Sequence, residues 1–321
     1  MERKRYIDCE AGLLIGVMIL SHCFGAASLL KSRAFAITYP FYFFMPWFFF
    51  KSGMLYTPQD IKTCLAKNTR KLLVPYCFFT VIGLLVHMTH SMLNGEFNLG
   101  AYFVSQTGLF LEEFALSGNP ALWFLFSFFM TKILYELLWR VMNDWLIVLI
   151  CFIVTSSIYY FLLELPRYCA NVPAGIMFYT LGHILSNKFR KVEILYIAVF
   201  VYFTSALSGW TIIDMHLNSC VHGHYYLWVP TAIAGIVILD WLFNHIPNIR
   251  ILEWMGQNAM VLLVTHMIII GVVQLLSHDI ILVTNKYTLF FILILSEIIC
   301  IPILVRMFSN KKYCWIIGKN L

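Results

Sequence analysis

An ionisable side chain, His22, lies inside the first long apolar stretch of this chain, which ends in Ile19-Leu20-Ser21-His22. An ionisable group at membrane depth is costly, and such groups are retained mostly where they have a function. Because the unperturbed pKa of imidazole is near neutrality, His22 could act as a general base or acid. The alternative is a neutral core histidine that is hydrogen-bonded to a neighbouring helix.

The depth of His22 follows from helix geometry. At 1.5 Å per residue, it lies about 21 Å along a helix from Asp8. If Asp8 is near the cytoplasmic interface, His22 lies beyond the membrane midplane, toward the outer side.

The composition of the chain is that of a polytopic membrane protein. It is 61% hydrophobic and 12% charged, with a mean hydropathy of +0.80, whereas about a quarter of the residues in ordinary soluble domains are charged. The net charge of +6 does not indicate nucleic-acid binding, because the basic residues fall in loops of cytoplasmic type. The nine cysteines contain no CxxC pair, and the loop histidines His222 and His224 lack a convincing ligand set, so no metal is expected.

Apolar runs of about 20 residues predict helices that cross the membrane. The sequence predicts an all-α bundle of about ten such helices in a single domain, residues 1–321. The expected spans are 10–30, 35–55, 73–92, 120–139, 145–163, 173–187, 194–211, 225–244, 255–276 and 287–307.

The distribution of Lys and Arg predicts that both termini are cytoplasmic. In that orientation the outer loops hold only Lys31, Arg33, Arg167 and Lys286. The cytoplasmic segments and helix ends hold all the others except Lys132, and these include Arg3, Lys4, Arg5, Lys51, Arg70, Lys71, Arg140, Arg250 and Arg306. We expect a multi-pass protein of the plasma (bacterial inner) membrane.

Several segments stand out in order along the chain: the first helix ending at His22, MPWFFFKSGML (45–55), RKLLVPY (70–76), LWFL (122–125), FYTLG (178–182) and LEWMGQNAM (252–260) with the later His266. These segments resemble motifs of the acyltransferase 3 family of membrane O-acyltransferases. Each match is loose alone, but together they span the chain in the order seen in the family.

The resemblance implies transfer of an acyl group other than aminoacyl, usually acetyl, from cytoplasmic acyl-CoA to a sugar hydroxyl. The acceptor would be an extracytoplasmic or lipid-linked glycan. The family's essential histidine falls on His22, which could accept the proton of the attacking hydroxyl. A transient acyl-histidine is an alternative that the sequence does not distinguish.

One departure from the family concerns Ala11, where the family usually has Arg or Lys eleven residues before its histidine. That position lies about 16 Å nearer the cytoplasm, a suitable depth for a CoA phosphate. Three interpretations remain: Lys51 supplies the charge, Arg5 or Lys4 supplies it from the interface, or donor handling is altered or lost. Lys51 could also simply extend toward the interface. With Arg70 and Lys71, Lys51 and Arg5 are the predicted CoA-binding residues.

Other polar residues are candidates for the acceptor site. His266 lies near the middle of the ninth predicted span and could orient the acceptor, although an interhelical hydrogen bond explains it equally well. Glu112 and Glu113 could bind sugar hydroxyls, and Trp123 could stack on a sugar face; the alternative is a solvated loop and an interfacial tryptophan. Glu297 lies within the tenth predicted span and needs a partner, for which His266 is one candidate.

Two other classes of function compete with the acyltransferase. A transporter or flippase of lipid-linked sugars would share the helix count and buried polar groups, but it is disfavoured by the ordered motifs and the lack of inverted-repeat symmetry. A non-catalytic membrane partner of a glycan-assembly system is kept open by Ala11. Membrane lipid surrounds the protein in every case, and a homodimer or a complex with polysaccharide-assembly proteins is also left open.

Overall fold

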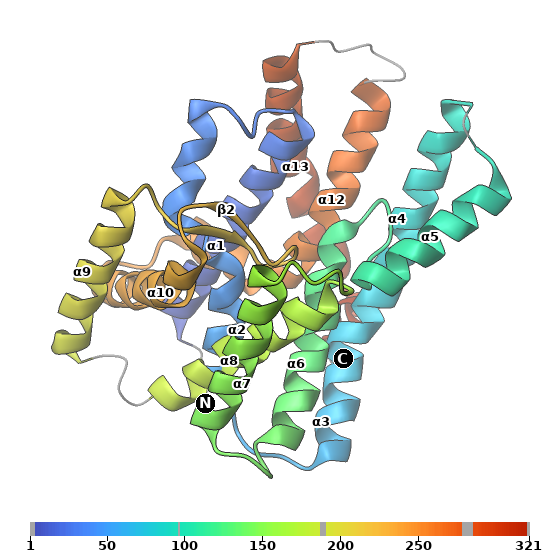
Figure 1. Cartoon of the computed structure of the whole chain (residues 1–321). Helices are drawn as coiled ribbons and strands as arrows, with labels where there is room; N and C mark the ends of the chain where they lie inside the picture. The colour runs from blue at the N-terminus through green and yellow to red at the C-terminus, as the bar shows by residue number, and fades with distance from the viewer. Residues whose placement is uncertain (1–3, 96, 187–190, 278–284, 320–321) are drawn as a thin grey trace. The chain divides into compact units, whose positions relative to one another are not determined.

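The computed structural model describes residues 4–95, 97–186, 191–277 and 285–319, which are mostly helical (Figure 1). They form two compact units, each assembled from separate stretches of the chain. The first unit comprises the described residues of Met1–Val17, Ile37–Ala66 and Ser127–Gln257, and the second those of Met18–Ala36, Lys67–Phe126 and Asn258–Leu321. Helix α1 (Arg5–Ala26) begins in the first unit and ends in the second.

The first unit is a bundle of helices with one small hairpin. Its elements are the start of α1, α2 (Phe44–Met54), most of α6 (Trp123–Leu138), α7 (Asp144–Tyr160), α8 (Tyr168–Leu185), α9 (Val192–Leu207), β1 (Ile212–Asp214), β2 (Ser219–His222), α10 (Trp228–His245) and α11 (Arg250–Gln257). Helix α8 packs against α2 and α7, and α10 packs against α9.

The second unit is also helical and contains the end of α1. Its other main elements are α4 (Val74–Leu93), α5 (Leu99–Glu113), the 3₁₀ turn Pro120–Leu122, α12 (Ala259–Leu275) and α13 (Lys286–Phe308). Helix α3 (Ile61–Asn68) and the π-helical turn Thr69–Leu73 lead into α4. Helix α12 packs against α4 and α13, and this contact positions the candidate site.

Glycine allows a close crossing of α2 and α8 in the first unit. A Cβ on Gly53 would collide with the backbone carbonyl of Tyr179, and a Cβ on Gly182 would collide with that of Phe50. Backbones that approach so closely require small residues, a common arrangement in membrane helices.

We expect Gly53→Ala to lower the free energy of unfolding by about 1–3 kcal/mol, since the added methyl group must force the two helices apart. The matched control is Gly108→Ala on α5, where an added Cβ meets no atom of the described structure within 4 Å. The control should be neutral or slightly stabilising. Thermal unfolding of the detergent-solubilised protein measures both, and equal melting temperatures for the two variants would contradict the crossing.

The described helices confirm an all-α, membrane-type fold, but not ten continuous spans. Five are long and apolar enough to cross a membrane: Arg5–Ala26, Ile61–Leu93, Pro120–Leu138, Tyr225–His245 and Lys286–Phe308. Helices α7 and α9, of 17 and 16 residues, are apolar but shorter.

Two predicted spans are wrong in detail, because the chain leaves α-helical geometry within them. The span predicted at 35–55 divides into the 3₁₀ segment Arg33–Phe41 and the 11-residue helix α2. The span predicted at 255–276 breaks at Asn258, whose φ and ψ of −113° and 15° separate α11 from α12. Asn258 follows Gly256, and both residue types are weak helix formers.

Asp214, the acidic residue near the loop histidines His222 and His224, lies at the end of β1 in the β1–β2 hairpin. One carboxylate oxygen of Asp214 accepts hydrogen bonds from the backbone N–H groups of His216 and Leu217, at 2.9 and 3.1 Å. Burial raises the pKa of Asp214, and these two hydrogen bonds oppose that shift. Among the described residues, no group of three His, Cys, Asp or Glu side chains is placed to hold a metal ion.

Candidate active site

The second unit brings His22 and His266 together, two residues that the sequence singled out separately. Their ring centroids are 5.1 Å apart, with the planes at 88° to each other. His266 on α12 is fully buried, whereas His22 on α1 is half-buried. His22 therefore keeps some exposed surface, whereas His266 keeps none.

The Nδ1 atom of His22 lies 3.0 Å from the Sδ atom of Met267. A thioether sulfur can accept a hydrogen bond but cannot donate one, so this contact favours the tautomer that carries the proton on Nδ1. In the neutral ring Nε2 then holds the lone pair. A histidine in this state can take a proton from a hydroxyl group.

The ring of His266 has a fixed orientation as well. Its Nδ1 donates to the backbone carbonyl of Leu262, at 3.0 Å, which leaves the lone pair on Nε2. That Nε2 atom is buried and has no hydrogen-bond partner among the described residues. A buried polar atom without a partner is uncommon in proteins and often marks a functional position or a bound molecule.

A cavity of about 620 Å³ in the second unit adjoins this histidine pair, and Met267 forms part of its wall. Its volume is typical of small-molecule sites. The walls come from the end of α1, the C-terminal half of α4, the segment before α6, α12 and the start of α13. Polar side chains among them are Ser28, His87, His90, Gln274 and Ser277.

The segment Gly118-Asn119-Pro120 ties the cavity wall to α12. The Nδ2 atom of Asn119 donates to the carbonyl of Val264 at 2.9 Å, and Gly118 and Pro120 line the cavity. Gly118 has a φ of +87°, and a Cβ there would collide with the carbonyl of Gly83. The sequence did not predict the hydrogen bond from Asn119 to Val264, because a lone Asn before a Pro indicates only a turn.

Glu297 on α13 is buried, and both of its carboxylate oxygens lack a hydrogen-bond partner among the described residues. The described structure therefore shows no hydrogen bond from Glu297 to His266, the partner considered from the sequence.

A second buried group of charges lies in the first unit. Lys51 on α2 forms ion pairs with Glu10 on α1, at 3.1 Å, and with Asp240 on α10. The Nε1 atom of Trp47 donates to Glu10 at 2.8 Å, and the Nδ2 atom of Asn244 donates to Asp240 at 3.1 Å. All three ionisable residues of this charge cluster are less than 5% exposed.

This charge cluster bears on the interpretation of Ala11. The predicted contact of Lys51 with a CoA phosphate stays a prediction, but two carboxylates already neutralise and bind the ammonium group. Glu10 went unnoticed in the sequence, although the argument that selected His22, an ionisable residue inside an apolar span, applies equally to it.

The other predicted CoA-binding residues are exposed. Arg5 lies at the start of α1, with its Nε atom 3.5 Å from Glu253 in the first unit. Arg70 and Lys71 lie in the π-helical turn before α4, in the second unit. A role for these three cations in donor binding stays a prediction.

Glu112, Glu113 and Trp123 do not line the cavity beside Met267. Glu112 is exposed at the end of α5, and Trp123 is buried at the start of α6. A role for these three residues in acceptor binding stays a prediction, while the wall of the cavity is formed by residues that were not predicted.

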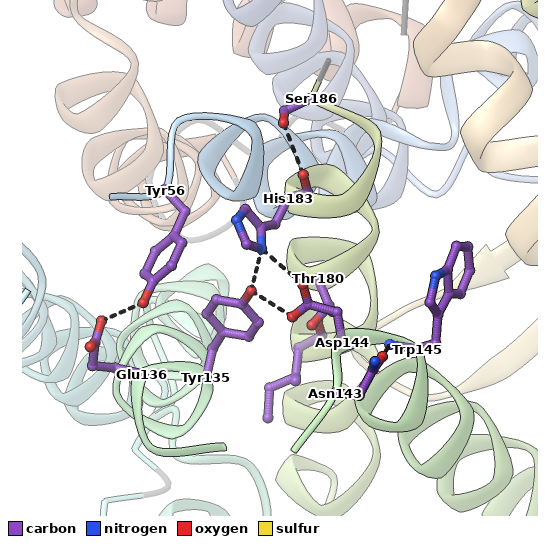
Figure 2. A network of polar contacts seen from close by, with 10 residues as sticks. Tyr56, Tyr135, Glu136, Asn143, Asp144, Trp145, Thr180, His183 and Ser186 are labelled. Carbon is purple, nitrogen blue, oxygen red and sulfur yellow. Dashed lines mark hydrogen bonds and ion pairs between the residues drawn. The ribbon is translucent and has the colours of Figure 1, made fainter. Parts of the chain in front are cut away.

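A polar network in the first unit holds His183 (Figure 2). Its Nδ1 lies 2.7 Å from the hydroxyl of Tyr135 and 3.1 Å from Asp144, which also accepts a hydrogen bond from Tyr135 at 3.0 Å. Nearby, the hydroxyl of Tyr56 donates to Glu136 at 2.9 Å. The network joins α6, α7 and α8, so it gives His183 a structural role.

Comparison with known proteins gives one match. The acyltransferase 3 family model, described as an acyltransferase domain, matches residues 5–307. Neither the curated proteins nor the solved structures give a significant match. The match contains both histidines of the pair and the charge cluster, and it extends over nearly the whole chain, so this protein belongs to the acyltransferase 3 family of multi-pass membrane acyltransferases.

Proposed function

We propose that this protein is an O-acyltransferase that moves an acyl group, in the simplest case acetyl, from cytoplasmic acyl-CoA to a polysaccharide hydroxyl. The polysaccharide is extracytoplasmic or lipid-linked, and the enzyme lies in the inner membrane of a bacterium. The observation that carries the proposal is the contact of the half-buried His22 with Met267, a wall residue of the cavity.

The proposed reaction requires one base and one leaving group. The Nε2 atom of His22 accepts the proton of the sugar hydroxyl as its oxygen attacks the thioester carbonyl. The C–S bond breaks, CoA leaves as a thiolate, and the imidazolium returns its proton to the sulfur. An ester and free CoA are the products, and no metal takes part.

The sidedness of the reaction follows from the predicted orientation. The cavity is lined by the ends of α1 and α12 and by the start of α13, which the Lys and Arg distribution places outside. The acceptor would therefore enter from the outer side. The donor would approach from the cytoplasmic side, where Arg5, Arg70 and Lys71 could attract its phosphates.

The purified protein in sealed proteoliposomes tests this proposal. With radiolabelled acetyl-CoA on one side and an envelope polysaccharide on the other, we expect CoA release that depends on the acceptor, and label that becomes bound to the glycan. Empty liposomes control for spontaneous hydrolysis. Movement of a lipid-linked sugar without any CoA release would instead identify a flippase, and absence of both activities across a panel of acyl donors would favour a non-catalytic partner.

A further inference from the structure

The wall of the cavity contributed by α12 forms a continuous stripe leading away from His22. Met267, Ile270, Gly271 and Gln274 all line the cavity, and their spacing of three, four and seven residues places them on one helix face. Gln274 is two turns beyond Met267, which is about 10 Å along the helix. A ligand whose reacting group lies at His22 could extend along this stripe to Gln274.

The amide of Gln274 presents a hydrogen-bond acceptor to the cavity. Its Nε2 donates to the backbone carbonyl of Ala26 at 3.3 Å, which fixes the orientation of the amide. The Oε1 atom has no hydrogen-bond partner among the described residues. One N–H of the amide is thus engaged with α1, and the oxygen, which accepts hydrogen bonds, is open to a ligand.

His87 on α4 presents a second acceptor by a similar arrangement. The hydroxyl of Tyr102 donates its proton to the carbonyl of Leu84 at 3.3 Å, so its oxygen must accept from the Nδ1–H group of His87, also at 3.3 Å. In the neutral ring Nε2 then carries the lone pair. The single donor of neutral His87 is therefore engaged by protein, as is one N–H of Gln274.

We infer that Gln274 and His87 form a recognition site in which Oε1 and Nε2 accept hydrogen bonds from two hydroxyl groups of the acceptor sugar. This inference rests on the proposed function and adds how the acceptor is selected. Hydroxyl groups are donors that a sugar supplies in abundance, and the two acceptors match them in kind. Val86 and Ile270, which line the same cavity, provide apolar surface for the C–H face of the sugar ring.

The test measures the KM for the acceptor separately from the KM for the acyl-CoA donor. Gln274→Met and His87→Leu should each raise the KM for the acceptor about 5- to 10-fold, which corresponds to one neutral hydrogen bond. The KM for acyl-CoA and the value of kcat should stay close to those of the unmodified enzyme. The matched controls are Gln257→Met at the end of α11 and His245→Leu at the end of α10, which lie in the first unit and should change neither KM.

Deoxy acceptors identify the hydroxyl groups concerned. The unmodified enzyme should have a higher KM for a deoxy acceptor that lacks a recognised hydroxyl than for the complete acceptor. In Gln274→Met or His87→Leu the two KM values should be equal, because the protein group that binds this hydroxyl has been removed. If Gln274→Met does not fold, Gln274→Asn, which withdraws the oxygen by one methylene group, should also raise the acceptor KM.

The outcomes separate this inference from the proposed function. Turnover by the unmodified enzyme with an unchanged acceptor KM in both variants would overturn the recognition site alone. If the unmodified protein releases no CoA, the proposed function fails, and calorimetric titration with the acceptor oligosaccharide decides the inference: weaker binding by both variants supports it, and equal binding overturns it.

Discussion

Replacement of His22 by alanine should lower the rate of acyl transfer by about 10²- to 10⁴-fold, the contribution expected of a general base. In the proposed mechanism the base is His22, whose Nδ1 lies against the sulfur of Met267 in the second unit. Without it the attacking hydroxyl must lose its proton to water, and the uncatalysed attack on the thioester is slow.

The measurement is acceptor-dependent CoA release by His22→Ala and His22→Gln, with His245→Ala as a control for loss of a histidine elsewhere. His245 is exposed at the end of α10. The affinity for acyl-CoA should be unchanged in all three, and the decline of activity at low pH that reflects protonation of the base should disappear in the His22 variants. Undiminished transfer by His22→Ala would exclude His22 as the base.

Replacement of Lys51 by methionine should destabilise the protein by about 3–5 kcal/mol, the cost of removing one partner from a buried ion pair. The carboxylates of Glu10 and Asp240 would remain in a buried environment with no compensating cation from Lys51. We expect a large fall in the thermal unfolding temperature in detergent. Lys62→Met, which removes an exposed lysine from α3, should have little effect.

A triple variant separates the structural role of Lys51 from a role in donor binding. Glu10→Gln, Lys51→Met and Asp240→Asn together remove every charge of the cluster, and they should recover much of the stability lost in Lys51→Met. If Lys51 serves only the fold, the recovered protein should have a normal KM for acyl-CoA. A raised KM would instead show that Lys51 compensates for Ala11 in holding a CoA phosphate.

The sequence predicted the two histidines that the structure pairs, but not the residues around them. Composition and ordered motifs predicted an all-α membrane acyltransferase, and the cost of burying imidazole selected both His22 and His266. The wall residues were not predicted, because Met267 has no distinctive chemistry and meets His22 across 245 residues of chain. Similarly, the pairing of Lys51 with Asp240 joins helices 189 residues apart, a contact that hydropathy does not encode.

The predicted helix boundaries were wrong where an apolar stretch contains a break in the helical backbone. The stretch around Asn258 is apolar enough to read as one span, yet its dihedral angles interrupt the helix. The hydropathy of a residue depends on its side chain and carries little information about its φ and ψ angles. A hydropathy profile therefore does not reveal a break between two apolar helices. A Gly or Asn within an apolar run is the available signal, and Gly256 and Asn258 provided it.

The attachment of Asn119 to the carbonyl of Val264 has a consequence for how acceptor range could diverge among related enzymes. The Gly118-Asn119-Pro120 segment borders the cavity from one side, and α12 borders it with Met267 and Gln274. Substitutions at this attachment would therefore resize the cavity while leaving the imidazole of His22 unaltered. Under the proposed function, changes in a short loop would accommodate new acceptors, and the proposed catalytic step would stay the same.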